Sequence, residues 1–143
     1  MSSLTSSQPF YQQQILAIVR IITASMLIFH GMEVFDEEKM KMYTGWFVDR
    51  KYSQPALMPY SGKVSELAIG IAYLLGFLTR IASVLMIFTF GGIIFLLGDK
   101  GNIFEGDQHP FMFVLIAIVF LGTGPGAWSI DKQLTAGSRP PKT

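Results

Sequence analysis

Four ionisable side chains in or beside long apolar stretches are the residues of this sequence best suited to chemistry. His30 and Glu33 are three residues apart, so they share one face of a helix. Glu66 lies inside the next apolar stretch, and His109 lies just before the last one. Because ionisable groups are costly inside a membrane, they mark functional sites or paired structural groups. We predict that the four residues meet in one polar pocket.

Several kinds of chemistry fit this pocket, and the residue types leave them open. Histidine and carboxylate at one depth could relay protons to a bound quinone. With Glu105 and Asp107 nearby in the chain, they could instead bind Zn²⁺ or Fe²⁺. They could also form a hydrogen-bonded structural network that holds the bundle together, or simply reach the headgroup water. A haem held by His30 and His109 is disfavoured because His109 directly precedes Pro110. We assign no metal site and no intrinsic cofactor, and keep a quinone as the candidate ligand.

A second pair of charges borders the opposite ends of the apolar stretches. Arg20 lies five residues into the first stretch, and Asp131 follows the last. An ion pair between them would neutralise a costly intramembrane charge. We predict a structural Arg20–Asp131 pair, with extension of Arg20 to lipid phosphates as the alternative.

The composition is that of a membrane protein. Of 143 residues, 21 are charged, or 15%, against about 25% in soluble domains. Residues 81–98 and 110–130 carry no charge, and a membrane helix needs about 20 mostly apolar residues. This pattern excludes a soluble globular protein. A net charge of +1 without a basic cluster argues against nucleic-acid binding, and the absence of cysteine excludes disulfides and iron–sulfur ligation by this chain.

These stretches predict an all-α, polytopic membrane protein built as a four-transmembrane-helix bundle. The bundle occupies residues 15–131, with spans at about residues 15–35, 59–78, 81–98 and 110–122. An even number of spans puts both termini on one side. The single Arg80 in the short second turn and the basic tail favour the cytoplasm for that side.

Three segments lie outside the spans. Residues 1–14 are rich in Ser and Gln and are predicted to be disordered or interfacial. The loop 36–58 mixes aromatic and basic residues, which favours an amphipathic helix in the headgroup layer at about residues 39–48. The alternative for this loop is a solvated segment with a few aromatics. Residues 132–143 form a polar tail.

Three short motifs occur in an order and spacing that resemble one family of membrane proteins. The first is a His–Gly pair that closes the first helix, in Phe29–His30–Gly31. The second runs from Glu66 to Arg80 and is a Glu followed by a Gly- and Leu-rich run into Leu–Thr–Arg. The third is Gly124–Pro125–Gly126, followed by a Ser and by Asp131. On these motifs, about residues 15–134 resemble the DoxX family. Two departures are Ala127–Trp128, where the family often has Arg–Tyr, and a fourth helix without an early acidic residue.

The resemblance implies a multi-pass bacterial inner-membrane protein in contact with the lipid bilayer and with membrane or redox partner subunits. It implies an accessory, quinone-proximal subunit of a respiratory or sulfur-redox assembly, with His30 and Glu66 as partners of the quinone. The chain would then be at most a quinone-binding subunit of an oxidoreductase, with the electron carriers on other subunits. The competing hypothesis is a non-catalytic scaffold or assembly factor for a partner membrane protein, and transport would require oligomerisation.

Overall fold

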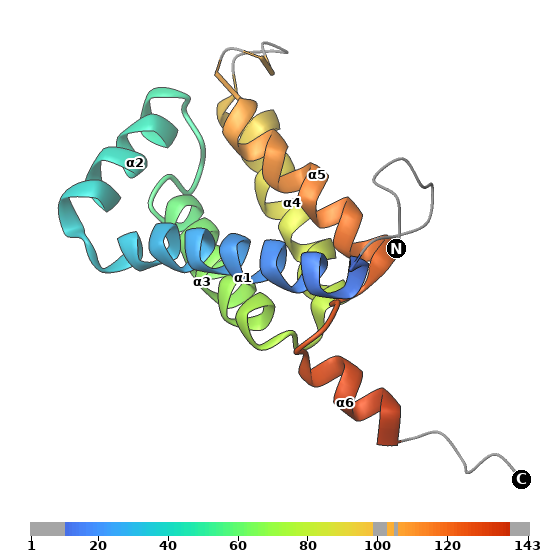
Figure 1. Cartoon of the computed structure of the whole chain (residues 1–143). Helices are drawn as coiled ribbons and strands as arrows, with labels where there is room; N and C mark the ends of the chain where they lie inside the picture. Colours follow the sequence, from blue (N-terminus) through green and yellow to red (C-terminus); the bar gives the residue numbers. More distant parts are fainter. Residues whose placement is uncertain (1–10, 99–102, 105, 138–143) are drawn as a thin grey trace, which may run out of the picture.

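The computed structural model describes residues 11–98, 103–104 and 106–137. These residues form helices and turns and contain no strand, in agreement with the predicted all-α class (Figure 1). The helices in chain order are α1 (Gln12–Gly31), a short 3-10 helix η1 (Met32–Phe35), α2 (Glu37–Asp49), α3 (Leu57–Leu75), α4 (Thr79–Leu97), α5 (Gln108–Thr123) and α6 (Ile130–Gly137).

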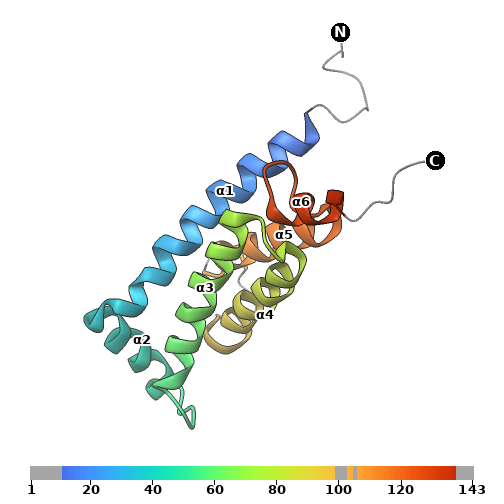
Figure 2. The same cartoon turned by 90° about the horizontal axis from the view of Figure 1, so that it is seen from below.

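The long helices form two packed pairs. α1 lies against α3, α4 lies against α5, and contacts between α3 and α4 join the pairs. Figure 2 shows that the start of α1 and α6 lie at one end of the molecule and that α2 lies at the opposite end. The two sets of polar residues predicted from the sequence therefore belong to opposite ends of the bundle.

Small residues allow α1 and α3 to approach closely. A Cβ atom on Gly31 would lie 2.6 Å from the backbone nitrogen of Leu67, and one on Gly70 would lie 2.9 Å from that of Ile28. Close backbone contact at small residues is the usual packing of membrane helices. The glycine of the first motif is thus needed for the contact between these two helices.

The core lies between α1, α3, α4 and α5, and its aromatic side chains pair across the helices. The Phe90 and Phe113 rings stack with centroids 4.6 Å apart, and Tyr73 meets Phe120 edge-to-face at 5.3 Å. The buried Tyr73 hydroxyl forms a 2.7 Å hydrogen bond with Ser83 Oγ, which itself donates to the Thr79 carbonyl. A buried tyrosine needs such a partner, and the pairing fixes α3 against α4.

Two helices, Gln12–Phe35 and Thr79–Leu97, are long and apolar enough to cross a membrane, and Gln108–Thr123 is a shorter apolar helix. The second predicted span coincides with α3, which carries Lys63 and Glu66 in its first half. The ends of these four helical segments lie within three residues of the predicted spans. Among the described residues, membrane-crossing length and composition are therefore met by two helices, and the four-span bundle stays a prediction.

The segments outside the predicted spans are more helical than expected. Helix α2 occupies the predicted amphipathic position, and its first turn is capped by the Asp36 carboxylate, which accepts hydrogen bonds from the N–H groups of Glu38 and Lys39 at 3.1 Å. The tail begins with α6, which the polar composition of residues 132–143 did not predict. Residues 1–10 and 138–143 lie outside the described part of the chain.

Candidate functional site

A cavity of about 260 Å³ lies at the α2 end of the molecule, where the last turn of α1 meets the other long helices. His30, Glu66 and His109 line it, so three of the four predicted pocket residues come together. Its remaining wall is mostly aromatic and aliphatic, with Lys63 as a further charge. The lining residues are His30, Tyr43, Trp46, Phe47, Met58, Pro59, Gly62, Lys63, Glu66, Phe90, Ile93, Leu97, His109 and Pro110.

The rings of the two histidines meet edge-to-face in the lining of this cavity. Their ring centroids are 5.2 Å apart at an interplanar angle of 62°, and His109 also meets Phe113 edge-on at 5.1 Å. His109 lies in the first turn of α5, and not before its helix as the sequence suggested. A proline near a helix start costs no hydrogen bond, so α5 begins at Gln108 and includes Pro110.

Glu33, the fourth predicted residue, lies behind the cavity wall and organises a network of charges. Its carboxylate pairs with Lys39 at 2.7 Å and with Lys63 at 2.9 Å, and it accepts a 2.8 Å hydrogen bond from the Tyr43 hydroxyl. Lys63 also pairs with Glu66 at 3.0 Å. Two lysines thus balance two glutamates, and the network links η1, α2 and α3.

Burial differs along this network. The side chain of Glu66 is 5% exposed, whereas that of Lys39 is 43% exposed. Exposed pairs contribute little to stability, so the interior pairs of Lys63 matter most. The sequence pointed to Glu33 and Glu66 but not to Lys63, although its position three residues before Glu66 on one helix was a readable signal.

Two groups of α2 have pKa values shifted by the network. The hydrogen bond to Glu33 raises the pKa of Lys39. Burial, followed by the hydrogen bond to Glu33, raises the pKa of Tyr43. Both shifts favour the protonated side chain: burial disfavours the Tyr43 phenolate, and the Glu33 carboxylate favours the proton on both groups. Lys39 therefore stays charged and Tyr43 stays neutral at physiological pH.

The metal alternative depended on further acidic residues. Within residues 11–98, 103–104 and 106–137, no group of three or more His, Cys, Asp or Glu is close enough to hold a metal ion. Glu105 lies outside the described residues. Asp107 is buried and lines a neighbouring cavity with Arg50, and it does not belong to the lining that contains the histidines.

At the other end of the molecule, Arg20 is fully buried and binds backbone groups. Its guanidinium donates to the carbonyl oxygens that end α3 and to those of the turn before α6. The acceptors are Tyr73, Leu74 (3.2 Å), Pro125 (2.9 Å), Ala127 (3.2 Å) and Trp128 (2.8 Å). Helix ends leave carbonyl groups without partners inside the helix, and a guanidinium has enough donors to bind several of them.

Asp131 binds N–H groups at the same junction. Its carboxylate accepts hydrogen bonds from the backbone nitrogens of Leu78 at 2.8 Å and Thr79 at 2.9 Å, at the start of α4. Among the described ion pairs, none joins Arg20 to Asp131 within 4.0 Å. The two residues therefore act on the same junction through separate backbone groups, a role that a pattern of charges along a sequence does not reveal.

The Gly–Pro–Gly motif carries the chain past α1 at this junction. Gly126 has φ +76°, and a Cβ atom there would lie 2.9 Å from the Ala17 backbone nitrogen. The next residue, Ala127, donates its N–H to the Gln13 carbonyl at 2.8 Å. Glycine is required here both by the left-handed backbone and by the close approach to α1.

Comparisons with known proteins agree with the motif-based resemblance. A family model described as DoxX matches residues 15–99. The chain is also similar to an uncharacterized protein from Haemophilus influenzae, with 28% identity over 139 residues, covering 93% of this chain and 97% of that relative. No solved structure gives a significant match. The matched segment runs from α1 through α4 and includes His30, Glu66 and Arg80.

Proposed function

Because this chain belongs to the DoxX family of membrane proteins, we propose that it is an accessory, quinone-proximal subunit of a respiratory or sulfur-redox assembly in the bacterial inner membrane. The observation that carries the proposal is the cavity at the α2 end, where an apolar wall surrounds two adjacent histidines and a buried glutamate. Ligand sites typically combine an apolar lining with a few convergent polar groups.

The donor set of this cavity fits a quinone. Phe47, Phe90 and Ile93 offer flat or aliphatic surface to a ring, and His30 and His109 offer ring nitrogens that can donate or accept a hydrogen bond. A neutral imidazole carries one N–H donor and one acceptor nitrogen, so each ring can form a hydrogen bond with an oxygen of the ligand. A bound quinone would supply the electron-accepting ring, with electrons delivered by a partner subunit.

The charge network behind the cavity supports this role for the histidines. Lys63 is shared between Glu33 and Glu66, so the glutamate in the cavity wall is already balanced by a cation. The pocket can therefore hold a neutral ligand without leaving a buried charge unpaired. In this proposal α1 with η1, α3, α4 and α5 cross the membrane, the termini face the cytoplasm, and α2 lies in the opposite headgroup layer.

Tryptophan fluorescence provides a direct test. The chain has two tryptophans, and Trp46 lines the cavity while Trp128 belongs to the opposite end. In a Trp128→Phe background, titration with a short-chain quinone should quench Trp46 saturably. His30→Gln should weaken binding about three- to tenfold through loss of one hydrogen bond. The matched pair Glu66→Gln and Glu37→Gln compares a buried cavity carboxylate with an exposed one on α2.

The Glu37→Gln control should bind the quinone as tightly as the parent protein does, and Glu66→Gln should bind it more weakly. If quinone quenches Trp46 equally in folded His30→Gln, in folded Glu66→Gln and in the parent protein, the quinone proposal is wrong.

The ion-pair network favours a second candidate function. Each of its carboxylates has a cationic partner within 3.0 Å, which is how a purely structural network is built. In that case the chain is a non-catalytic scaffold or assembly factor for a partner membrane protein. Glu33→Gln and Glu66→Gln would then reduce the amount of protein in the membrane, and the quinone titration would show no saturable quenching in the parent protein.

A further inference from the structure

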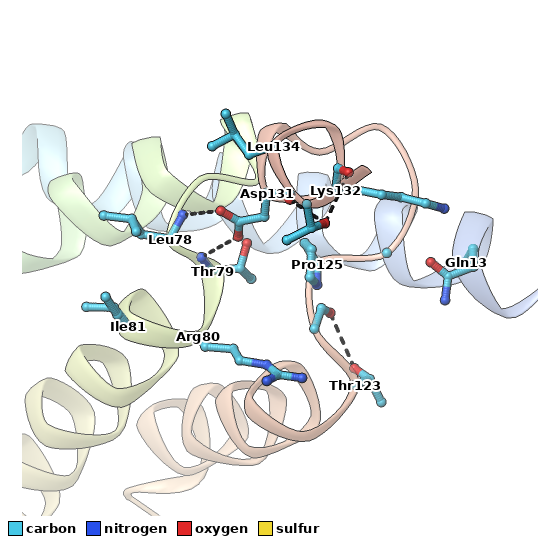
Figure 3. A pocket seen from close by; sticks show the side chains of 13 residues that line it. Gln13, Leu78, Thr79, Arg80, Ile81, Thr123, Pro125, Asp131, Lys132 and Leu134 are labelled. Carbon is cyan, nitrogen blue, oxygen red and sulfur yellow. Dashed lines mark hydrogen bonds between the residues drawn. The ribbon is translucent and has the colours of Figure 1, made fainter. Parts of the chain in front are cut away.

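The terminus-side end of the molecule contains a second cavity, of about 600 Å³, that the proposed quinone role does not use. It lies between the start of α4, the end of α5, the glycine-containing turn and α6 (Figure 3). Its wall combines exposed apolar side chains with cationic groups and threonine hydroxyls. This combination points to a ligand with an anionic head and an apolar body.

Arg80 is the principal cation of this cavity. Its guanidinium extends from the first turn of α4 toward the end of α5, near Thr123 (Figure 3). A Cβ atom on Gly124 would be 3.9 Å from its Nη2 atom, so the guanidinium lies over the glycine turn. In the described part of the chain Arg80 has no hydrogen-bond or ion-pair partner. Its planar fork of donors matches the oxygens of a phosphate group.

A buried hydroxyl provides a second, independent indication. Thr79 is fully buried and lines the same cavity, and its Oγ1 atom has no hydrogen-bond partner among the described residues. In Figure 3 its side chain extends from the start of α4 toward the cavity. A buried polar group without a partner is costly, so a ligand oxygen at this position would remove a penalty.

The charge balance of the lining favours an anion. The charged lining residues are Arg80, Lys132 and Asp131, which sum to one net positive charge. The Asp131 carboxylate is already bound by the N–H groups of Leu78 and Thr79. Its negative charge is therefore stabilised by the start of α4, and the positive charges of Arg80 and Lys132 favour an anionic ligand.

The apolar part of the wall indicates what the rest of the ligand is. Leu78, Ile81 and Leu134 are 46%, 64% and 59% exposed and border the cavity. Leu78 directly precedes α4, the predicted third span, and Ile81 lies in its first turn, at the depth where the end of the span would meet lipid headgroups. This step rests on the membrane-spanning arrangement proposed above.

From these observations we propose that the cavity binds the phosphate of an anionic phospholipid, with Arg80 at the phosphate, Lys132 adding positive charge to the cavity wall, Thr79 as an added donor and the apolar rim against the acyl chains. A free phosphate compound shares the same head chemistry. The two sources differ in whether the apolar rim contributes to binding.

The test uses the full chain in mild detergent, with phosphatidylglycerol, phosphatidylcholine or inorganic phosphate as the added probe. Native mass spectrometry counts retained lipid, and thermal unfolding reports stabilisation. Phosphatidylglycerol should stabilise the protein more than phosphatidylcholine. Arg80→Gln should weaken phosphatidylglycerol binding about tenfold or more, through loss of a charge-assisted fork, and Arg80→Lys should restore part of it. Lys41→Gln removes an exposed charge at the other end of the molecule and should change nothing.

Thr79→Val separates ligand binding from folding. Removing an unpartnered buried hydroxyl should leave the lipid-free protein as stable as the parent or more so, while reducing stabilisation by phosphatidylglycerol. Equal stabilisation by phosphatidylcholine and phosphatidylglycerol, or unchanged phosphatidylglycerol binding in Arg80→Gln, would overturn the proposal. Equal protection by inorganic phosphate would support the phosphate site and assign it to a soluble compound. Quenching of Trp46 by quinone should be the same in Arg80→Gln, so this test is independent of the quinone site.

Discussion

The two ends of the bundle manage buried charge in different ways. At the terminus side, Arg20 binds five backbone carbonyls and Asp131 binds two backbone N–H groups. At the α2 end, the charges of Glu33, Lys63 and Glu66 bind one another. Backbone groups do not titrate, so the first arrangement is suited to holding helix ends together. Side-chain partners can exchange protons, so the second is suited to chemistry or regulation.

The surroundings of Arg20 and of Glu33 reinforce this difference. Arg20 is fully buried between α1, the end of α3 and the turn before α6. The network of Glu33 borders a cavity through Lys63, Glu66 and Tyr43. A charge with backbone partners and no adjacent cavity is structural. A charge network that borders a cavity can also respond to a ligand.

The largest expected loss of stability follows from replacing Arg20, which directly tests whether a buried charge with backbone partners holds the helix ends together. Arg20→Met leaves several buried carbonyls without donors and should destabilise the protein by about 3–5 kcal/mol. Detergent-micelle unfolding measures this loss. Arg50→Met is the control, because Arg50 is exposed at the other end and donates to Leu97 and Trp46 carbonyls. If both variants unfold at the same denaturant concentration, Arg20 does not hold the junction.

Glu33→Gln is expected to have an intermediate effect. It leaves the largely buried Lys63 with Glu66 as its one remaining anionic partner among the described residues and weakens the contact with Tyr43, so we expect a loss of about 1–3 kcal/mol. Unfolding in micelles measures it, with Glu37→Gln on the exposed face of α2 as the matched control. A loss larger than that of Arg20→Met would show that the α2 end is the stronger structural element.

The smallest effect concerns alkaline pH. The raised pKa of Tyr43 means that the unfolded chain releases this proton first, at the ordinary tyrosine pKa of about 10. The contribution of Tyr43 is therefore complete below about pH 10 and is lost as pH rises above it, because the unfolded state binds fewer protons there. Unfolding free energy measured from pH 8 to 11 should fall less steeply in Tyr43→Phe. Tyr60→Phe, an exposed tyrosine of α3, should retain the parent slope.

Sequence patterns were sufficient for the helices and for most of the pocket. Apolar runs of membrane length predicted the long helices to within a few residues, and costly ionisable groups identified His30, Glu66 and His109. The sequence missed the central role of Lys63 and the helix α6. Lys63 is a member of the network only because η1 folds Glu33 back over α3, a contact between segments 30 residues apart in the chain.

The amino-acid sequence by itself determined the helical class, the family and the residues that are too costly to bury without a partner. These properties depend on local composition and spacing, which act within a few helical turns. The tertiary structure alone decided the partners. Arg20 and Asp131 were predicted to bind each other, yet each binds backbone groups exposed where helices end. Such groups are present in every residue and carry no sequence signal, so only the arrangement of the helices determines which of them a buried charge will bind.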